Sequence, residues 1–238
     1  MGIRVTRIST FKEGYNPAVI NFLFDASYSM NKVKSIIAQC ITSLILPALS
    51  KADERKRAAV RLALAAFSET IQKLTAKPGY SSINELKRME PIPVSRLYAP
   101  GLDGNTALYQ ALIDGINHAV EAGYEVMKML GIRKIKVEVV CLTDGENTVK
   151  GYTEADVRRK IESLKGGPID LKVCLAYFKT DADITRAEFE SIGKACGIPK
   201  GNLHFWADHG ESDEEQQRAF RKLIEVLSRE SMQNAMRQ

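Results

Sequence analysis

The sequence predicts one α/β domain, a doubly wound and mostly parallel six-stranded sheet flanked by helices, with one short antiparallel edge strand. Short apolar runs of strand length alternate with longer amphipathic segments, which is typical of parallel strands joined by crossover helices. The 238 residues are 45% hydrophobic and 26% charged, as in globular proteins. No internal repeat or low-complexity linker divides the chain. We therefore expect a single hydrophobic core with helices on both faces of the sheet.

Six segments have the length and composition of strands. They are residues 18–24, 60–67, 70–75, 135–142, 169–178 and 203–206. The first, AVINFLF, and the fourth, IKVEVVCL, are continuous apolar runs, which indicates strands buried on both faces. The segment at 70–75 is short, and we expect it to pair antiparallel at an edge.

Helices are predicted between these strands from apolar residues spaced three and four apart. They span residues 30–49, 107–130, 153–164 and 185–196, and a last one begins at 212; a short helix at 82–89 interrupts an irregular stretch. Thr153 and Ser212 each precede an acidic residue by three positions, the pattern of a capping box. Gly197 is expected to end the fourth helix. The polar residues after Glu230 are expected to fray.

These elements divide the chain into an α/β domain at 17–230, an N-terminal extension or extra strand at 1–16, and a polar tail at 231–238. Composition adds little about function. The formal net charge is +5, from 34 basic and 29 acidic residues, so nucleic acid, an acidic protein and no charged partner all remain open. No apolar run reaches the roughly 18 residues of a membrane helix. The first residues lack a secretory h-region, and the four scattered cysteines fit a reducing cytoplasm.

Polar side chains follow the predicted strands at three places. Asp25, Ser27 and Ser29 follow the first strand in the stretch Asp-Ala-Ser-Tyr-Ser, and Asp144 follows the central strand. Thr106 opens the long helix after Gly104 and Asn105. In an open α/β sheet, ligands bind beyond the carboxyl ends of the strands. We therefore expect these three loops to meet at one edge of the sheet.

The side chains of these loops are hard oxygen donors, two carboxylates and three hydroxyls. Such donors suit Mg²⁺ or Mn²⁺, with Ca²⁺ as a further substitute, and no soft ligand favours zinc or copper. Alternate residues of an extended turn point the same way, so Asp25, Ser27 and Ser29 can converge. A cation held by neutral hydroxyls and water stays electrophilic and can accept a carboxylate from outside.

The order D-x-S-x-S, then G-x-T, then a strand ending L-T-D-G resembles the metal-ion-dependent adhesion site of von Willebrand factor type A domains. The resemblance covers nearly the whole chain. It implies that Ser27, Ser29 and Thr106 ligate Mg²⁺, that Asp25 and Asp144 act directly or through water, and that a partner protein supplies an Asp or Glu side chain.

One residue departs from the family pattern. Tyr28 stands between the two serines, where glycine is frequent in such domains. We expect Tyr28 to be exposed and to contact the partner, together with a rim formed by Asn105, Gly145 and Glu146.

Each position alone has an ordinary explanation. Ser29 and Thr106 are common helix N-caps, and Asp144 with Gly145 is a common turn pair. Only the joint occurrence of all five donors points to a metal site.

The function expected from this resemblance is a stand-alone, intracellular and Mg²⁺-dependent protein-binding adaptor. Similar prokaryotic domains work beside AAA+ ATPases, chelatase subunits, kinases or phosphatases, and the stretch LYAPGLDGNTAL, residues 97–108, looks most like the tellurium-resistance-associated group. Two other functions stay open. One is a nucleic-acid-associated protein of the Ku-like or Ro-like kind, and the other is a metal-dependent phosphohydrolase. No nucleophile elbow, P-loop or poised base is present, so we expect no enzyme.

Overall fold

The structure is a computed structural model that describes residues 17–40, 60–74, 81–82, 102, 104–145, 147–179, 184–207 and 212–236. Four predictions concern residues outside these ranges. They are the N-terminal extension or extra strand at 1–16, the end of the first helix at 41–49, the short helix at 82–89 beyond Ser82, and the placement of Glu146.

All six predicted strands are present and form one sheet in the order β3-β2-β1-β5-β6-β7. The strands are β1 (Ala18–Asp25), β2 (Val60–Phe67), β3 (Ile71–Lys73), β5 (Ile135–Thr143), β6 (Ile169–Phe178) and β7 (Leu203–Trp206). All are parallel except β3, which runs antiparallel to β2 as expected. A two-residue strand, β4 (Ser81–Ser82), also pairs with β2. It was not predicted because two residues are too short to show a period.

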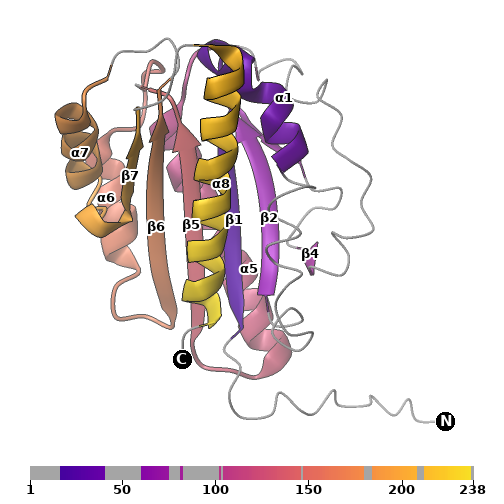
Figure 1. Ribbon diagram of the computed structural model, residues 1–238. Helices are drawn as coiled ribbons and strands as arrows, with labels where there is room; N and C mark the ends of the chain where they lie inside the picture. Colours follow the sequence, from indigo (N-terminus) through magenta and orange to yellow (C-terminus); the bar gives the residue numbers. More distant parts are fainter. Residues whose placement is uncertain are drawn as a thin grey trace.

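Helices cover both faces of this sheet (Figure 1). One face carries α1 (Asn31–Cys40) and α8 (Asp213–Met236), and the other carries α5 (Leu108–Leu130), α6 (Glu154–Ser163) and α7 (Arg186–Ala195). Short 3₁₀ turns precede α1 (η1, Tyr28–Met30) and β7 (η4, Lys200–Asn202). The predicted α/β class is therefore confirmed. Among the described helices, none is long and apolar enough to cross a bilayer.

The alternation of side chains along the strands makes two cores. In β1, Phe22 and Phe24 face α1 and α8, whereas Val19 and Leu23 face α5. Gly115 of α5 permits close approach to this second face, since an added Cβ would lie 2.5 Å from Leu23 Cδ1. Asn21 is buried there too, and its side-chain amide donates to the carbonyl of Gly115 at 3.1 Å.

The helix ends follow the sequence signals closely. Thr153 with Asp156 and Thr185 with Glu188 form capping boxes at α6 and α7, and Ser212 bonds Glu215 in the same way. Gly197, just past α7, has φ +78°, a left-handed conformation that glycine adopts without strain.

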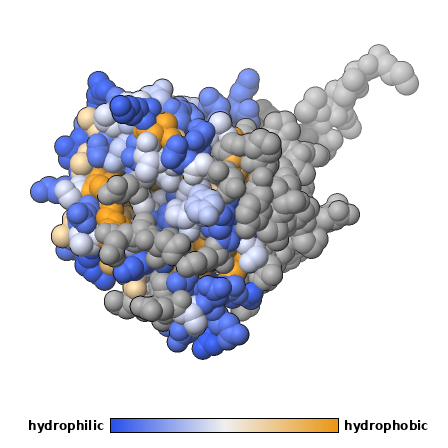
Figure 2. All heavy atoms as spheres, turned by 90° about the horizontal axis from the view of Figure 1, so that it is seen from above, coloured by the Kyte–Doolittle hydropathy of each residue, from blue (hydrophilic) through white to orange (hydrophobic). Residues whose placement is uncertain are grey.

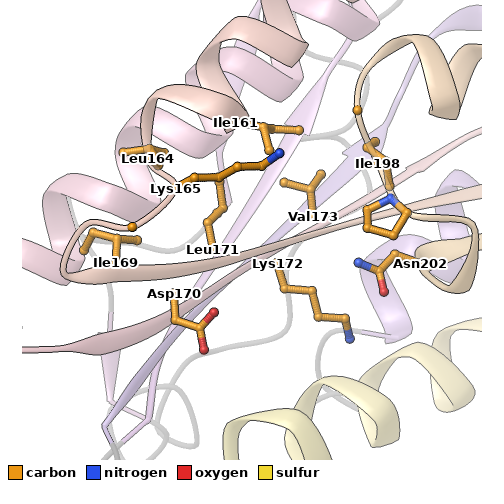
Figure 3. Close-up of a pocket in the computed structure, with 13 residues that line it drawn as sticks. Ile161, Leu164, Lys165, Ile169, Asp170, Leu171, Lys172, Val173, Ile198 and Asn202 are labelled. Atoms are coloured by element: carbon orange, nitrogen blue, oxygen red, sulfur yellow. The ribbon is translucent and has the colours of Figure 1, made fainter.

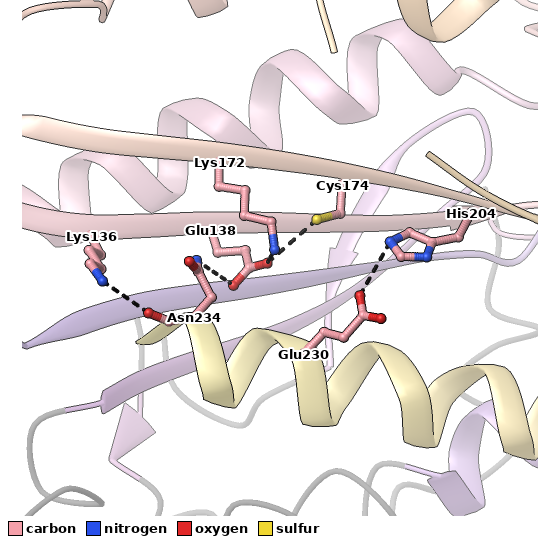
Figure 4. A network of polar contacts seen from close by, with 7 residues as sticks. All are labelled: Lys136, Glu138, Lys172, Cys174, His204, Glu230 and Asn234. Atoms are coloured by element: carbon pink, nitrogen blue, oxygen red, sulfur yellow. Dashed lines mark hydrogen bonds and ion pairs between the residues drawn. The ribbon is translucent and has the colours of Figure 1, made fainter. Parts of the chain in front are cut away.

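The expected fraying after Glu230 is wrong, because α8 continues to Met236. Figure 4 shows what holds this end of the helix. Asn234 donates from its amide to Glu138 Oε2 at 3.2 Å, and Lys136 Nζ donates to the Asn234 carbonyl at 3.1 Å. Ser231 is buried as well. Asn234, one of the polar residues that suggested a tail, thus pairs with polar residues of β5.

Candidate metal centre

The three loops predicted to meet lie at the carboxyl ends of the strands, at the top of Figure 1. Because β1 pairs directly with β5, Asp25 and Asp144 leave the sheet side by side. Figure 2 views this end from above; among its coloured atoms, hydrophobic residues form small patches between hydrophilic ones. The tertiary structure therefore brings together residues separated by more than a hundred positions.

The loop after β1 is tightly folded. The Ser27 amide donates to Asp25 Oδ1 at 2.9 Å, and the hydroxyl oxygens of Ser27 and Ser29 lie 3.2 Å apart. Asp25 is 0% exposed and Ser27 is 2% exposed. The expected convergence of these side chains is thus consistent with the observed contacts.

The loop after β5 contacts the same carboxylate. Thr143 donates its hydroxyl to Asp25 Oδ2 at 2.6 Å and accepts from the Gly145 amide at 3.3 Å. Asp144 is 1% exposed. Burial, and next the neighbouring carboxylate of Asp144, raise the pKa of Asp25 to about 7, although the hydrogen bonds from Thr143 and Ser27 act in the opposite direction. The pair thus carries an electrostatic cost that a cation would relieve.

The third loop is joined to both of the others. The Tyr28 amide donates to the Gly104 carbonyl at 3.3 Å. Thr106 donates from its amide to Thr148 Oγ1 at 2.8 Å and accepts from the Thr148 amide at 2.9 Å, which fixes its backbone.

Thr106 does not cap α5. The N-cap position is Ala107, and α5 has no side-chain cap. Thr106 is 5% exposed, and within the described part of the chain its hydroxyl makes no hydrogen bond. The capping explanation is therefore wrong for Thr106, and its oxygen is available as a ligand.

The loop after β2, which was not predicted as part of the site, also contacts it. Ser68 donates its hydroxyl to the Asn105 carbonyl at 2.7 Å and accepts from the Gly104 amide at 3.2 Å. Glu69 accepts from the Asn105 side-chain amide at 3.1 Å. The rule that drew attention to β1 and β5, polar residues directly after a strand, would also have found Ser68 and Glu69.

The predicted rim is only partly at the surface. Tyr28 is 72% exposed, as expected, and Asn105 is exposed too. Gly145 is buried, so it is no surface contact in this arrangement. Contact of Tyr28 with a partner stays a prediction.

The donor set fits a hard divalent cation. Asp25 and Asp144 would supply charge, and Ser27, Ser29 and Thr106 would supply neutral oxygens, which is the chemistry Mg²⁺ prefers. Among the described residues no place, the candidate site included, gathers three or more His, Cys, Asp and Glu side chains. The free thiols of Cys141, Cys174 and Cys196 are buried.

Comparison with known proteins gives the fold. Neither a protein-family model nor a curated protein matches this sequence. Solved structures do resemble it. The pilus adhesin SpaC from Lactobacillus rhamnosus GG has a TM-score of 0.62 at 12% identity, over 94% of this chain and 31% of that one.

Two further structures show the same likeness. The PilB minor pilin from Streptococcus sanguinis has a TM-score of 0.53 at 14% identity, over 92% of this chain and 63% of that one. Proximal thread matrix protein 1 from the mussel byssus has a TM-score of 0.51 at 15% identity, over 90% and 47%. The chain thus spans less than two thirds of each of these proteins.

The strand order, the flanking helices and these matches agree. The chain has a von Willebrand factor type A-like fold. At such low identity the likeness concerns the fold alone. What the site binds must be argued from its own residues.

Proposed function

We propose that this protein is an intracellular, Mg²⁺-dependent protein-binding adaptor, which captures an acidic side chain of a partner through the site at Asp25, Ser27, Ser29, Thr106 and Asp144. One observation carries the proposal. Two fully buried carboxylates from neighbouring strands adjoin a pair of serine hydroxyls at an edge of the sheet. A bound cation would offset the electrostatic cost of burying both carboxylates, and neutral hydroxyl ligands would leave that cation electrophilic.

The exposed groups around this cluster suit a protein ligand. Tyr28 presents a phenol beside the hydroxyls, and Asn105 is held outward by Glu69. An aromatic ring and an amide next to a metal favour contact with a polypeptide carrying Asp or Glu. The three free thiols fit a reducing compartment. SpaC, which shares the fold, is a pilus adhesin.

The metal-binding half of the proposal is tested by calorimetric titration of Mg²⁺ into the chelator-treated protein. Wild type is expected to bind one ion, and Asp25→Ala is expected to bind none. Asp170→Ala, which removes an exposed carboxylate at the opposite end of the sheet, is the matched control and should bind as wild type does. Equal Mg²⁺ binding by Asp25→Ala would overturn the proposal.

The partner-binding half is tested by affinity capture in Mg²⁺ and in EDTA. Binding should be lost in EDTA, return on adding Mg²⁺, and weaken in Tyr28→Gly. The proposal assigns no catalytic residue, so no turnover of p-nitrophenyl phosphate is expected with Mg²⁺ or Mn²⁺. Turnover that disappears in Asp25→Asn would instead favour a phosphohydrolase.

A further inference from the structure

On one side, the lower half of β6 has no pairing strand among the described residues. β7 pairs only with the upper half of that strand, beginning at Leu175 opposite Leu203. The preceding residues, Ile169 to Cys174, pair with β5 on one side, and no described strand pairs with them on the other. An open strand edge presents rows of backbone donors and acceptors that another strand can complete.

Two hydrogen bonds identify the residues that face the open edge. Ile135 donates from its amide to the Pro168 carbonyl at 3.0 Å, so the even-numbered residues of β6 face β5. Lys179 donates to the Trp206 carbonyl at 3.0 Å, so the odd-numbered residues face β7. Because parallel strands alternate in this way, the amides and carbonyls of Ile169, Leu171 and Val173 point to the open side.

A cavity of about 350 Å³ lies along this edge. Figure 3 shows its walls, which come from the end of α6, from β6 and from the segment around η4. The side chains of Ile161, Leu164 and Ile198 belong to the core layer on the α5 side, the same side as Ile169 and Val173. A strand placed here would therefore find backbone partners along one side and apolar side chains along one face.

The basic side chains around the cavity favour the binding of an acidic strand. Lys165 is exposed on the rim and has no ion pair within the described part of the chain. A neighbouring cavity of about 580 Å³ shares Gly197, Ile198 and Pro199 and is lined by Arg158, Lys194 and Lys200. Two of these cations are already paired, Lys200 with Glu190 at 3.0 Å and Arg158 with Glu162 at 3.9 Å. Within the described part of the chain, the positive charge without an ion pair therefore lies on Lys165 and Lys194. Asp170, the other lining carboxylate, belongs to the even-numbered residues and so faces the α8 side of the sheet.

We propose that the open edge of β6 binds an extended acidic peptide segment of a partner protein, which adds a strand beside Ile169, Leu171 and Val173 and directs a carboxylate to Lys165. Main-chain pairing would supply affinity, and the apolar wall with Lys165 would supply selectivity. This surface lies at the opposite end of the sheet from the candidate metal centre. The inference stands without the proposed Mg²⁺ site, and it gives the protein a second place to hold a partner.

Amide hydrogen exchange by NMR tests the proposal in the full-length protein. The probe is the blocked heptapeptide TVTETVT, which places two valines and a glutamate on one face. It should slow exchange of the Leu171 and Val173 amides. The amides of Asp170 and Lys172, already bonded to β5, should not change. The same peptide with N-methylated amides on its pairing side should have no effect. Unchanged Leu171 exchange at saturating peptide, or equal protection by the methylated peptide, would overturn the proposal.

Charge-reversal variants distinguish specific binding of the acidic peptide from nonspecific hydrophobic binding. Lys165→Glu should weaken binding of TVTETVT about fivefold and strengthen binding of TVTKTVT, as expected for reversal of a surface ion pair. Lys222→Glu, an exposed charge reversal on α8, is the control and should leave both affinities unchanged. Leu171→Pro removes an outward amide, together with the partly buried Leu171 side chain, and should abolish protection of Val173. Protection that rises with protein concentration before any peptide is added would mean that a second copy occupies the edge, and would also overturn the proposal.

Discussion

Asp25 and Glu138 are both buried carboxylates of the two central strands, but the protein surrounds them differently. Glu138, 3% exposed, forms an ion pair with Lys172 at 2.7 Å and accepts from Asn234 and Cys174 (Figure 4). Asp25 accepts from neutral groups, those of Ser27 and Thr143, and adjoins a second carboxylate. The Glu138 site contains its own cation, whereas the Asp25 site would take one from solution in the proposed function.

The charge of the neighbouring groups distinguishes a buried carboxylate with a structural role from one that could bind a ligand. A buried charge is costly unless it is paired. The partner of Glu138 is Lys172 of the same chain, so the ion pair forms a fixed contact between β5 and β6, which Asn234 extends to α8. At Asp25 the missing charge would come from Mg²⁺, so stability and binding become linked to the metal concentration.

The largest effect is expected from removing the internal cation. Lys172→Met leaves Glu138 buried without its charge partner and should lower the free energy of unfolding by about 3 kcal/mol, since breaking a buried pair is strongly destabilising. Urea denaturation measures this in EDTA and in Mg²⁺, and the loss should be the same in both. The double variant Lys172→Met with Glu138→Gln should recover part of it. A loss in the double variant equal to the sum of the two single losses would show that the pair is not coupled.

At the candidate metal centre, the effect of removing a carboxylate on stability should depend on whether Mg²⁺ is present. Asp144→Asn removes one of two repelling carboxylates, so in EDTA it should lower the free energy of unfolding only slightly, or even raise it. In Mg²⁺ it should abolish the metal-induced gain of wild type, about 2.7 kcal/mol at a concentration one hundred times Kd. Thermal melts of both proteins in both buffers give the four values needed. A Mg²⁺-induced gain that persists in Asp144→Asn would remove Asp144 from the site.

A smaller effect is expected from the hydroxyl that orients Asp25. Thr143→Val keeps the shape of the side chain but removes its donor to Asp25 Oδ2. Loss of a hydrogen bond to a charged group should weaken Mg²⁺ binding by about 1.5 kcal/mol, roughly tenfold. Calorimetric titration measures it. Ser163→Ala, which removes an exposed hydroxyl on α6, is the control and should titrate as wild type does.

The smallest expected effect is on the pH dependence of stability, through His204 at the edge of the polar contacts around Glu138. Burial lowers the pKa of His204 below its ordinary 6.5, while Glu230, 3.5 Å away, raises it. A lowered pKa means that the unfolded chain takes up a proton first, so stability should fall as the pH drops below 6.5. Glu230→Gln should steepen this fall by less than about 1 kcal/mol, because the pair is partly exposed. Melting temperatures from about pH 8 to about pH 5 measure the slope, and an unchanged slope would show that the two groups are not linked.

Local signals predicted the elements well because they report what each segment must bury. The strands 169–178 and 203–206 were predicted with their observed limits, since the runs rich in apolar residues coincide with the strands. The end of α8 was missed for the opposite reason. Its polar residues are satisfied by Lys136 and Glu138, about a hundred positions earlier in the chain, and no local pattern contains that information.

The candidate site divides in the same way. The donor residues and the strands that they follow could be predicted from the sequence, because residue chemistry and strand length are local properties. The pairing of β1 with β5, the joint burial of Asp25 and Asp144, the contact of Ser68 with the Gly104 loop and the restriction of β7 to the upper half of β6 appear only in the folded protein. These depend on which distant segments pack against each other, and that is set by the burial of the whole chain rather than by any one segment.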